Sequence, residues 1–266
     1  MYVRSFMHEK GFLEVQTPIL TASSPEGARD FLVPSRLNPG KFYALPQAPQ
    51  QFKQLLMTSG VDKYFQIAPC FRDEDARADR SPTEFYQIDM EMAFATQEDV
   101  FAVFEELYSK IFKKFAGAKV TTPFKRLTYE DAINKYASDK PDLRNPLTVA
   151  DVTEIFKDTE FNAFKGNIIK ALHVDCKGNG RKFYDSLTEF LKSREAKGLA
   201  YVHVDENGEY QTGISKFITE EQKTELQKLL NYKPGETIFF IADQKQKAIK
   251  FADVLRQELG KRLNLI

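Results

Sequence analysis

The sequence predicts an α+β fold in two domains, the first of which contains an antiparallel sheet. Three observations lead to this expectation. Two strand-like segments, 63–72 and 84–94, are joined by a charged loop, and an amphipathic helix at 98–115 follows them. From about residue 146 the elements become shorter and alternate between strand and helix patterns. The length of 266 residues suits one or two domains, and we place the first over 1–146.

The composition is that of an ordinary globular protein and excludes several classes of function. Lys plus Arg equals Asp plus Glu at 38 each, so no overall field attracts nucleic acid or a membrane surface. Cys70 and Cys176 lie far apart in the sequence, which indicates neither a disulfide framework nor a zinc site. No apolar run approaches the roughly 18 residues of a membrane span. We therefore expect a cytoplasmic protein without a membrane partner.

The N-terminal elements follow in order. Residues 2–10 have helical spacing of apolar side chains, and Gly11 is placed to end that helix. Because so short a helix is marginal alone, we expect further sequence before it. A strand pattern at 12–20 comes next. A strand at 41–46 then leads to a helix at 48–59 that has a proline in its first turn.

The segment from Glu84 is the clearest strand pattern of the chain. Its alternation places two sets of side chains on opposite faces, Tyr86, Ile88, Met90 and Met92 on one and Phe85, Gln87, Asp89 and Glu91 on the other. We expect the first face to be core and the second to be polar. The loop before it is far longer than the ~2–5 residues of a common hairpin. Arg72 ends the preceding strand, where its guanidinium can grip a phosphate or a carboxylate.

On composition alone, this polar face could be a solvated surface with ion pairs. The order of the residues favours a site. F-R-D-E from Phe71, a charged loop, and F-Y-Q-I-D-M-E from Phe85 together resemble motif 2 of the class II aminoacyl-tRNA synthetases, over about 65–94. The sequence KGFLEVQTPIL resembles motif 1, about 3–20, through which that family dimerises.

Three further segments narrow the resemblance to the bacterial aspartate type. These are SSPEGARDFLVPSR at 23–36, ALPQAPQQFKQLLM at 44–57 and SDKPDLRNP at 138–146. Two departures occur, since Ala48 stands where the family often has serine and the loop end RSPTEF is one residue longer than in some relatives.

The resemblance to aspartyl-tRNA synthetases implies that ATP activates L-aspartate to an aspartyl-adenylate, which is transferred to tRNA. Arg72 is the implied catalytic residue, bridging the α-phosphate and the substrate carboxylate. The implied ATP-binding residues are Arg72, Asp73, Glu74, Ser81 and Phe85. The implied aspartate-binding residues are Glu26, Gln50, Lys53, Arg72, Gln87 and Asp89. Lys53 would pair with the side-chain carboxylate of aspartate, although a helix lysine taken alone is ordinarily solvated.

Residues 147–246 resemble the insert that these enzymes share with the B subunit of a tRNA-dependent amidotransferase. The pattern predicts helices near 183–194 and 219–230, a strand at 237–243 and a type I′ hairpin at Asn207-Gly208. Its basic residues are candidate tRNA contacts or a solvated face, namely Lys165, Lys170, Lys177, Arg181 and Lys182.

Two histidines and the C-terminal segment complete the domain. His173 and His203 lie in apolar runs and are better explained as core or edge residues than as metal ligands. Residues 247–266 form a helix that we expect to lead back towards the catalytic core.

The resemblance also defines what we do not find. An anticodon-binding domain before motif 1 and motif 3 after the insert have no counterpart in the sequence. The ligands for Mg²⁺ are expected in the motif 3 segment, so no metal ligand is assigned. We expect a homodimer that binds ATP, L-aspartate and tRNA-Asp, leave open whether tRNA-Asn is also an acceptor, and expect little activation by this chain alone.

Two alternatives remain open at this point. One is a non-catalytic fragment that retains only tRNA binding or dimerisation, which tRNA binding without adenylate formation would support. The other is an aspartate-utilising relative such as an ammonia-dependent asparagine synthetase, which a test for asparagine release would detect. The segment after residue 146 argues against the second alternative.

Overall fold

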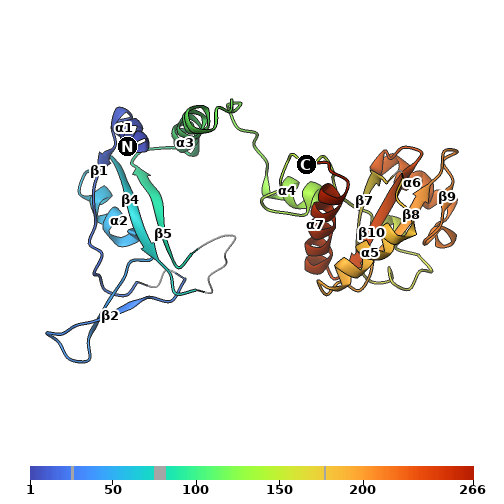
Figure 1. Ribbon diagram of the computed structural model, residues 1–266, viewed down its shortest axis with the longest axis horizontal. Coiled ribbons are helices and arrows are strands. Elements are labelled where there is room, and N and C mark those ends of the chain that lie inside the picture. The colour runs from blue at the N-terminus through green and yellow to red at the C-terminus, as the bar shows by residue number, and fades with distance from the viewer. Residues whose placement is uncertain (25–26, 75–81, 177) are drawn as a thin grey trace. The chain divides into compact units, whose positions relative to one another are not determined.

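The computed structural model describes residues 1–24, 27–74, 82–176 and 178–266. The chain divides into two compact units, Met1–Lys125 and Arg126–Ile266 (Figure 1). Both units combine helices with antiparallel strand pairs, which confirms the predicted α+β class.

Unit 1 is built on a three-stranded sheet in the order β1-β4-β5. Strands β4 (Lys63–Phe71) and β5 (Glu84–Met92) pair antiparallel along their whole lengths. Strand β1 (Leu13–Glu14) joins β4 in parallel. The expected strand at 12–20 is thus reduced to two residues, and Pro18, which has no N–H to donate, lies in the irregular segment that follows.

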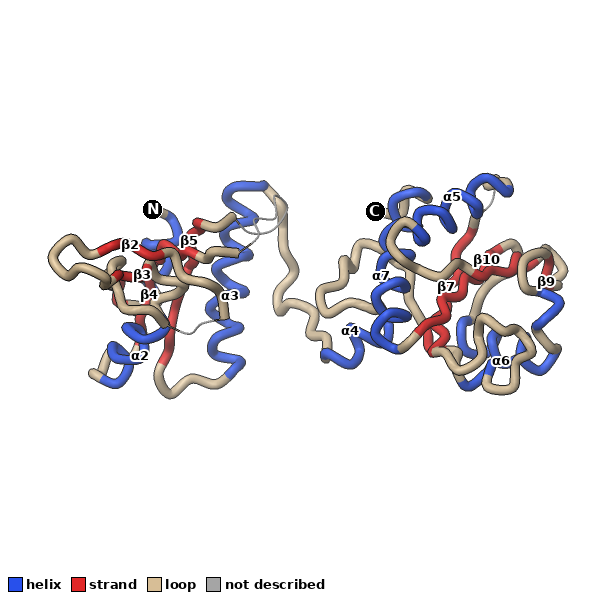
Figure 2. Tube along the Cα trace, turned by 90° about the horizontal axis from the view of Figure 1, so that it is seen from below, coloured by secondary structure: helices blue, strands red, loops and turns tan. Residues whose placement is uncertain are grey.

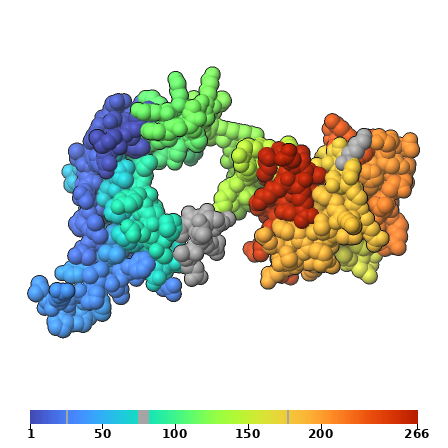
Figure 3. Space-filling model, viewed as in Figure 1, coloured from blue at the N-terminus to red at the C-terminus, as the bar shows by residue number. Residues whose placement is uncertain are grey.

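Three helices accompany this sheet, α1 (Tyr2–Glu9), α2 (Gln50–Thr58) and α3 (Gln97–Ile111). A capping box between Thr96 and Asp99 begins α3. A π-helical turn, Phe112–Ala116, ends the helix at Gly117, which has the left-handed conformation expected for its place. A hairpin of β2 (Leu32–Pro34) and β3 (Phe42–Ala44) projects from the rest of the unit (Figure 3).

The core of unit 1 is small and lies at one end of the β4–β5 hairpin, beside α1 and α3 (Figure 2). Met90 and Met92 pack against it. Tyr86 and Ile88 belong to the same face of β5, yet they are 67% and 39% exposed. The prediction that this whole face is core is therefore wrong for the first half of β5, because the core cluster beside α1 and α3 covers only Met90 and Met92 in the second half.

Unit 2 contains a five-stranded sheet in the order β6-β7-β10-β8-β9, with every neighbouring pair antiparallel. Its strands are β6 (Ala150–Asp151), β7 (Ile168–Asp175), β8 (Ala200–Val204), β9 (Tyr210–Gln211) and β10 (Glu236–Asp243). Its helices are α4 (Tyr129–Tyr136), α5 (Arg181–Lys192), α6 (Glu220–Leu230) and α7 (Lys245–Arg262), with 3-10 turns η2 (Glu154–Phe156) and η3 (Ser215–Phe217).

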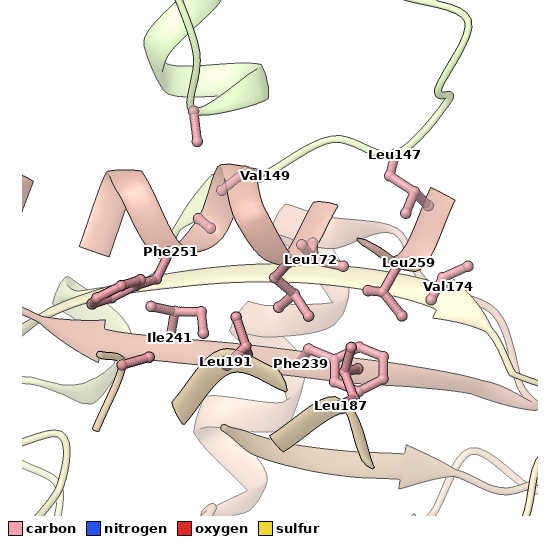
Figure 4. Close-up of a cluster of buried hydrophobic side chains, with 14 of the residues drawn as sticks. Leu147, Val149, Leu172, Val174, Leu187, Leu191, Phe239, Ile241, Phe251 and Leu259 are labelled. Atoms are coloured by element: carbon pink, nitrogen blue, oxygen red, sulfur yellow. The ribbon is translucent and has the colours of Figure 1, made fainter. Parts of the chain in front are cut away.

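Hydrophobic clusters cover both faces of this sheet. On one face, side chains of α5 and α7 pack over β7 and β10, as Leu187, Leu191, Phe251 and Leu259 show in Figure 4. On the other face, α6 and the phenylalanine-rich segment around η2 pack over the same strands. Phe251, Leu255 and Leu259 of α7 are thus buried against the sheet of unit 2.

Unit 2 begins at Arg126, earlier than the expected boundary after residue 146. A buried arginine explains why the preceding segment belongs to it. Arg256 of α7 is 1% exposed, and its guanidinium donates to the carbonyls of Asp142, Asn145 and Leu147 at 2.7–2.9 Å. The side chain of Asn145 donates in return to the carbonyl of Arg256 at 2.8 Å. These bonds attach the segment to α7.

The hairpin between β8 and β9 forms where the sequence predicts it, but its turn is of another type. A type I′ turn needs positive φ at both central residues, and of the predicted pair only Gly208 has it. Asp205 decides the conformation, since its Oδ1 accepts hydrogen bonds from the N–H groups of Asn207 and Glu209 at 2.8 and 2.9 Å. The turn is therefore a wider loop closed by an aspartate side chain.

Candidate active site

The polar face of the β4–β5 hairpin carries a row of functional side chains, as the sequence predicts. In the antiparallel register, Cys70 lies opposite Phe85, and Gln66 lies opposite Asp89. Directly opposed residues share a face, so Tyr64 and Glu91 extend the same row. At ~3.3 Å per residue, Phe85 and Asp89 are separated by roughly 13 Å along the strand. The row therefore has two ends with different chemistry.

Lys53 forms the first end. Helix α2 directs its ammonium onto β5, where it contacts Asp89 Oδ1 at 2.9 Å and Glu91 Oε1 at 2.8 Å. The side chains of Lys53 and Asp89 are each only 11% exposed, while that of Glu91 is 38% exposed. A solvated helix lysine is excluded by this burial.

The charges at this end are strongly coupled. Burial alone would lower the pKa of Lys53, but its hydrogen bonds to Glu91 and Asp89 outweigh that effect and raise the pKa. Burial and the adjacent charge of Asp89 raise the pKa of the Tyr64 phenol. Asp89 Oδ2 is buried and has no hydrogen-bond partner in the described parts of the chain. A buried carboxylate oxygen of this kind can accept a donor from a ligand.

Arg72 and Phe85 form the second end. Arg72 directly follows β4, and its guanidinium lies over the ring of Phe85 at 5.1 Å from the ring centre. Its backbone N–H donates to the carbonyl of Thr83, so the start of the loop is held to the start of β5. A guanidinium held in this way can bind a phosphate or a carboxylate through its planar set of N–H groups.

The other predicted residues divide into four groups. Gln87 lies in the row between the two ends and accepts a hydrogen bond from Cys70 Sγ at 3.4 Å. Gln50 at the start of α2 and Glu74 after Arg72 are exposed. Asp73 pairs through its backbone with Arg29, which brings the segment 27–30 to the beginning of the motif 2 loop. Glu26 and Ser81 lie outside the described residues.

The structure adds residues that the sequence analysis did not select. Gln66 Oε1 accepts from Tyr64 OH at 2.8 Å and from Thr17 Oγ1 at 3.1 Å. Glu91 supplies the second carboxylate for Lys53. The alternation of β5 had placed Glu91 on this face. Gln66 could be found only from the pairing of β4 with β5, which the sequence alone does not reveal.

A further addition, Gln47, holds Ala28 and Asp30 in place. Its side chain accepts from the N–H of Ala28 at 3.1 Å and donates to the carbonyl of Ala28 at 2.9 Å and to Asp30 Oδ1 at 2.5 Å. Gln47 is 3% exposed. The sequence offered only the position of Gln47 within the P-Q-x-P-Q pattern as a signal.

A metal site is not evident in this arrangement. Among residues 1–24, 27–74, 82–176 and 178–266, no three or more His, Cys, Asp and Glu side chains gather in a way that could hold a metal ion. The two carboxylates nearest the site, Asp89 and Glu91, are already bound to Lys53. We therefore assign no residue to Mg²⁺.

Within the described residues, no helix is both long and apolar enough to cross a bilayer.

Known proteins resemble this chain over its whole length. An aspartate–tRNA(Asp/Asn) ligase of Wolbachia sp. subsp. Brugia malayi is 56% identical over 271 residues, covering 99% of this chain and 45% of the relative. The corresponding ligase of Rickettsia bellii is 54% identical over 272 residues, covering 100% and 45%. The chain thus spans 45% of the length of these relatives. A crystal structure from Leishmania major Friedlin, assigned to an aspartyl-tRNA synthetase, has a TM-score of 0.37 and 31% identity, covering 44% of this chain and 21% of its own.

The family of the chain follows from a second comparison. The model of the family described as tRNA synthetases class II (D, K and N) matches residues 1–262. This match and the names of the relatives confirm the resemblance that motif 2 indicated. The chain belongs to the class II tRNA synthetases of the aspartate, lysine and asparagine group.

Proposed function

We propose that unit 1 carries the amino-acid and adenylate-forming part of an aspartate–tRNA ligase. One observation supports this most directly, namely that a buried, carboxylate-bound ammonium (Lys53) and a guanidinium stacked on a phenylalanine (Arg72) share one face of the hairpin. Relatives at 54–56% identity bear the name aspartate–tRNA(Asp/Asn) ligase.

The Lys53 end suits the amino acid. The ammonium of Lys53 would bind the side-chain carboxylate of L-aspartate, and Gln50 would border that pocket. The orphaned Asp89 Oδ2 would accept from the substrate ammonium, with Gln87 beside it and Glu26 proposed from the loop. The uncharged amide of asparagine would add no charge to the pairs that Lys53 already makes with Asp89 and Glu91, so asparagine would bind more weakly than aspartate.

The Arg72 end suits the nucleotide. The ring of Phe85 would stack on adenine, and Glu74, Asp73 and Ser81 are proposed around the base and phosphates. Arg72 would contact the α-phosphate and the substrate α-carboxylate together. A carboxylate oxygen then attacks the α-phosphorus in line, the bond to the bridging oxygen breaks, and pyrophosphate leaves with that electron pair. Catalysis of this step rests on positioning and on charge stabilisation by Arg72.

The whole ligase would then transfer the aspartyl group to the terminal ribose of tRNA-Asp, or of both tRNA-Asp and tRNA-Asn as the relatives' names state. We further propose a homodimer and Mg²⁺-bound ATP. Both cysteines are free thiols, which suits the proposed cytoplasmic location.

Calorimetric titration of the chain with L-aspartate, in the presence of ATP and Mg²⁺, tests the amino-acid site. Lys53→Met should weaken aspartate binding by about 30-fold or more, since truncating one partner of a buried charge pair costs ~2–5 kcal/mol. Lys63→Met is the matched control, because Lys63 belongs to β4 and lies outside the row. Equal binding of L-asparagine and L-aspartate would contradict the proposed role of Lys53.

A further inference from the structure

A cavity separate from the candidate active site lies entirely within unit 2. Helix α7 packs on one face of the sheet, over β7 and β10. On the same face, a cavity of about 600 Å³ lies beside β8 and β9. Its lining includes Asn179, Arg181, Tyr184, Tyr201, His203 and Glu206. This volume is within the ~300–1,000 Å³ of small-molecule sites. The motif 1 and motif 2 resemblance leaves this cavity without a role.

Two aromatic rings form one wall of the cavity. Tyr184 of α5 and Tyr201 of β8 are stacked, with ring centres 4.5 Å apart and planes at 13°. Backbone packing fixes Tyr201, because a Cβ at Gly213 would lie 1.9 Å from the carbonyl oxygen of Tyr201. Ile214 N–H also donates to that carbonyl at 3.1 Å. The aromatic wall is therefore held in place before any ligand arrives.

Polar groups lie beside this wall. Thr237 is fully buried, and its Oγ1 lies 3.1 Å from Tyr184 OH and 3.4 Å from His203 Nδ1. Burial raises the pKa of the Cys176 thiol to about 11, so this lining residue is a neutral thiol at pH 7. The cavity thus has hydrogen-bonding groups for a planar polar ligand, and its thiol is not activated as a nucleophile.

Charges of both signs stand at the mouth of the cavity. Arg181 begins α5, its side chain is 90% exposed, and it makes a long 3.6 Å contact with Asp185. Its guanidinium can turn to a phosphate. The carboxylates of Asp185 and Glu206 can accept from the hydroxyls of a ribose, which is how acidic residues hold nucleotide sugars elsewhere.

We propose that this cavity binds a single nucleotide. Its base would lie against the tyrosine wall with an edge toward His203, its ribose near Glu206 and its phosphate on Arg181. Aromatic and polar walls with both charge signs suit a nucleotide better than a simple anion or an apolar ligand. The nucleotide can be free or an unpaired residue of an RNA strand. The inference does not depend on the aspartate site, since every lining residue belongs to unit 2.

Binding to the full chain tests this proposal. Cytidine 5′-monophosphate is titrated by calorimetry, and a dye-labelled, unstructured eight-residue oligocytidylate is followed by fluorescence anisotropy. Tyr201→Leu should weaken binding by about tenfold or more, the usual loss when a stacking ring is removed. Arg181→Ala should weaken it by about fivefold and reduce its dependence on salt.

Lys192→Ala is the matched control, because it removes a cation from the other end of the same helix and should leave affinity unchanged. Arg181 is exposed, so its variant tests the site even where Tyr201→Leu perturbs folding. Binding of the mononucleotide supports a free-nucleotide ligand, and binding of the oligonucleotide alone supports RNA. The proposal would be overturned if neither probe binds. It would also be overturned if Arg72→Ala in unit 1 weakens binding of the probes while Arg181→Ala does not.

Discussion

The two units use their sheets in opposite ways. In unit 2, helices and loops bury both faces of a five-stranded sheet, and two large hydrophobic clusters result. In unit 1, the β4–β5 hairpin has charged groups on one face, while the other face is covered at Met90 and exposed at Tyr86. Buried apolar area is the main source of stability. The difference indicates that stability resides chiefly in unit 2, while the proposed aspartate and ATP sites lie in unit 1.

The largest expected effect is in the core of unit 2. Phe239 is fully buried between α5 and α7, so Phe239→Ala should reduce the free energy of unfolding by about 3–5 kcal/mol. Hydrogen exchange read by mass spectrometry should show protection lost in β7 and β10 and retained in β4 and β5. Tyr129→Ala, at a residue 75% exposed in the same unit, is the control and should change little. Loss of protection in both units together would show that they unfold as one.

Lys53→Met should have the next largest effect and should act on unit 1. Asp89 would remain buried without a cation, at a cost of about 3 kcal/mol in the free energy of unfolding. Chemical denaturation measures this loss in the free energy of unfolding, and hydrogen exchange of β4 and β5 shows whether it occurs in unit 1. Lys135→Met removes a lysine whose ion pair with Asp131 is exposed, so it should have no measurable effect. An unchanged stability in Lys53→Met would show that charge coupling does not hold unit 1 together.

High pH should weaken the same cluster. The pKa of Lys53 is raised in the folded state, so its stabilisation is complete below the ordinary lysine pKa of 10.5 and is lost as pH rises through the higher folded value. The raised pKa of Tyr64 acts in the same direction above 10.0. The free energy of unfolding of unit 1 should therefore fall as the pH rises above about 10. The fall should be smaller in Lys53→Met, and an equal fall in both proteins would assign it to other groups.

The smallest expected effect separates the two halves of the apolar face in unit 1. Tyr86→Ser should change the free energy of unfolding by less than about 0.5 kcal/mol, because Tyr86 is 67% exposed. Met90 lies four residues further along β5 on the same face and packs on the core. Met90→Ser should therefore lower the free energy of unfolding by about 2 kcal/mol. Thermal denaturation compares them directly. A large loss in Tyr86→Ser would mean that another surface covers it in solution.

Local patterns in the sequence predicted most elements of the fold. The helix at 98–115, the strands at 63–72 and 84–94 and the final helix were found at nearly their observed bounds, because each has a clear apolar period. Two expectations about the bounds and turns of these elements were wrong. The strand at 12–20 is reduced to Leu13–Glu14, with Pro18 in the irregular segment that follows, and the Asn207-Gly208 turn is widened by the Asp205 side chain. The hydrogen bonds of Asp205 are not visible in a local pattern.

The candidate site shows a similar division. Arg72, Phe85, Gln87 and Asp89 could be placed from the strand period and the motif 2 resemblance. The burial of Lys170, by contrast, was not foreseen. It was predicted among the solvated or tRNA-facing lysines, yet it is 4% exposed and bound to Asp151 at 3.2 Å, so it cannot reach a phosphate. Lys177, of the same group, lies outside the described residues.

The sequence by itself determined which side chains share the polar face of β5, because successive residues of a strand point to opposite sides. Only the tertiary structure decided how those side chains are paired. Lys53 meets Asp89 and Glu91 because α2 packs on the hairpin, and Arg256 meets the carbonyls of 142–147 because α7 returns to that segment. The same packing left Tyr86 exposed. Contacts between distant segments depend on how whole elements pack, and no local pattern of residues specifies that.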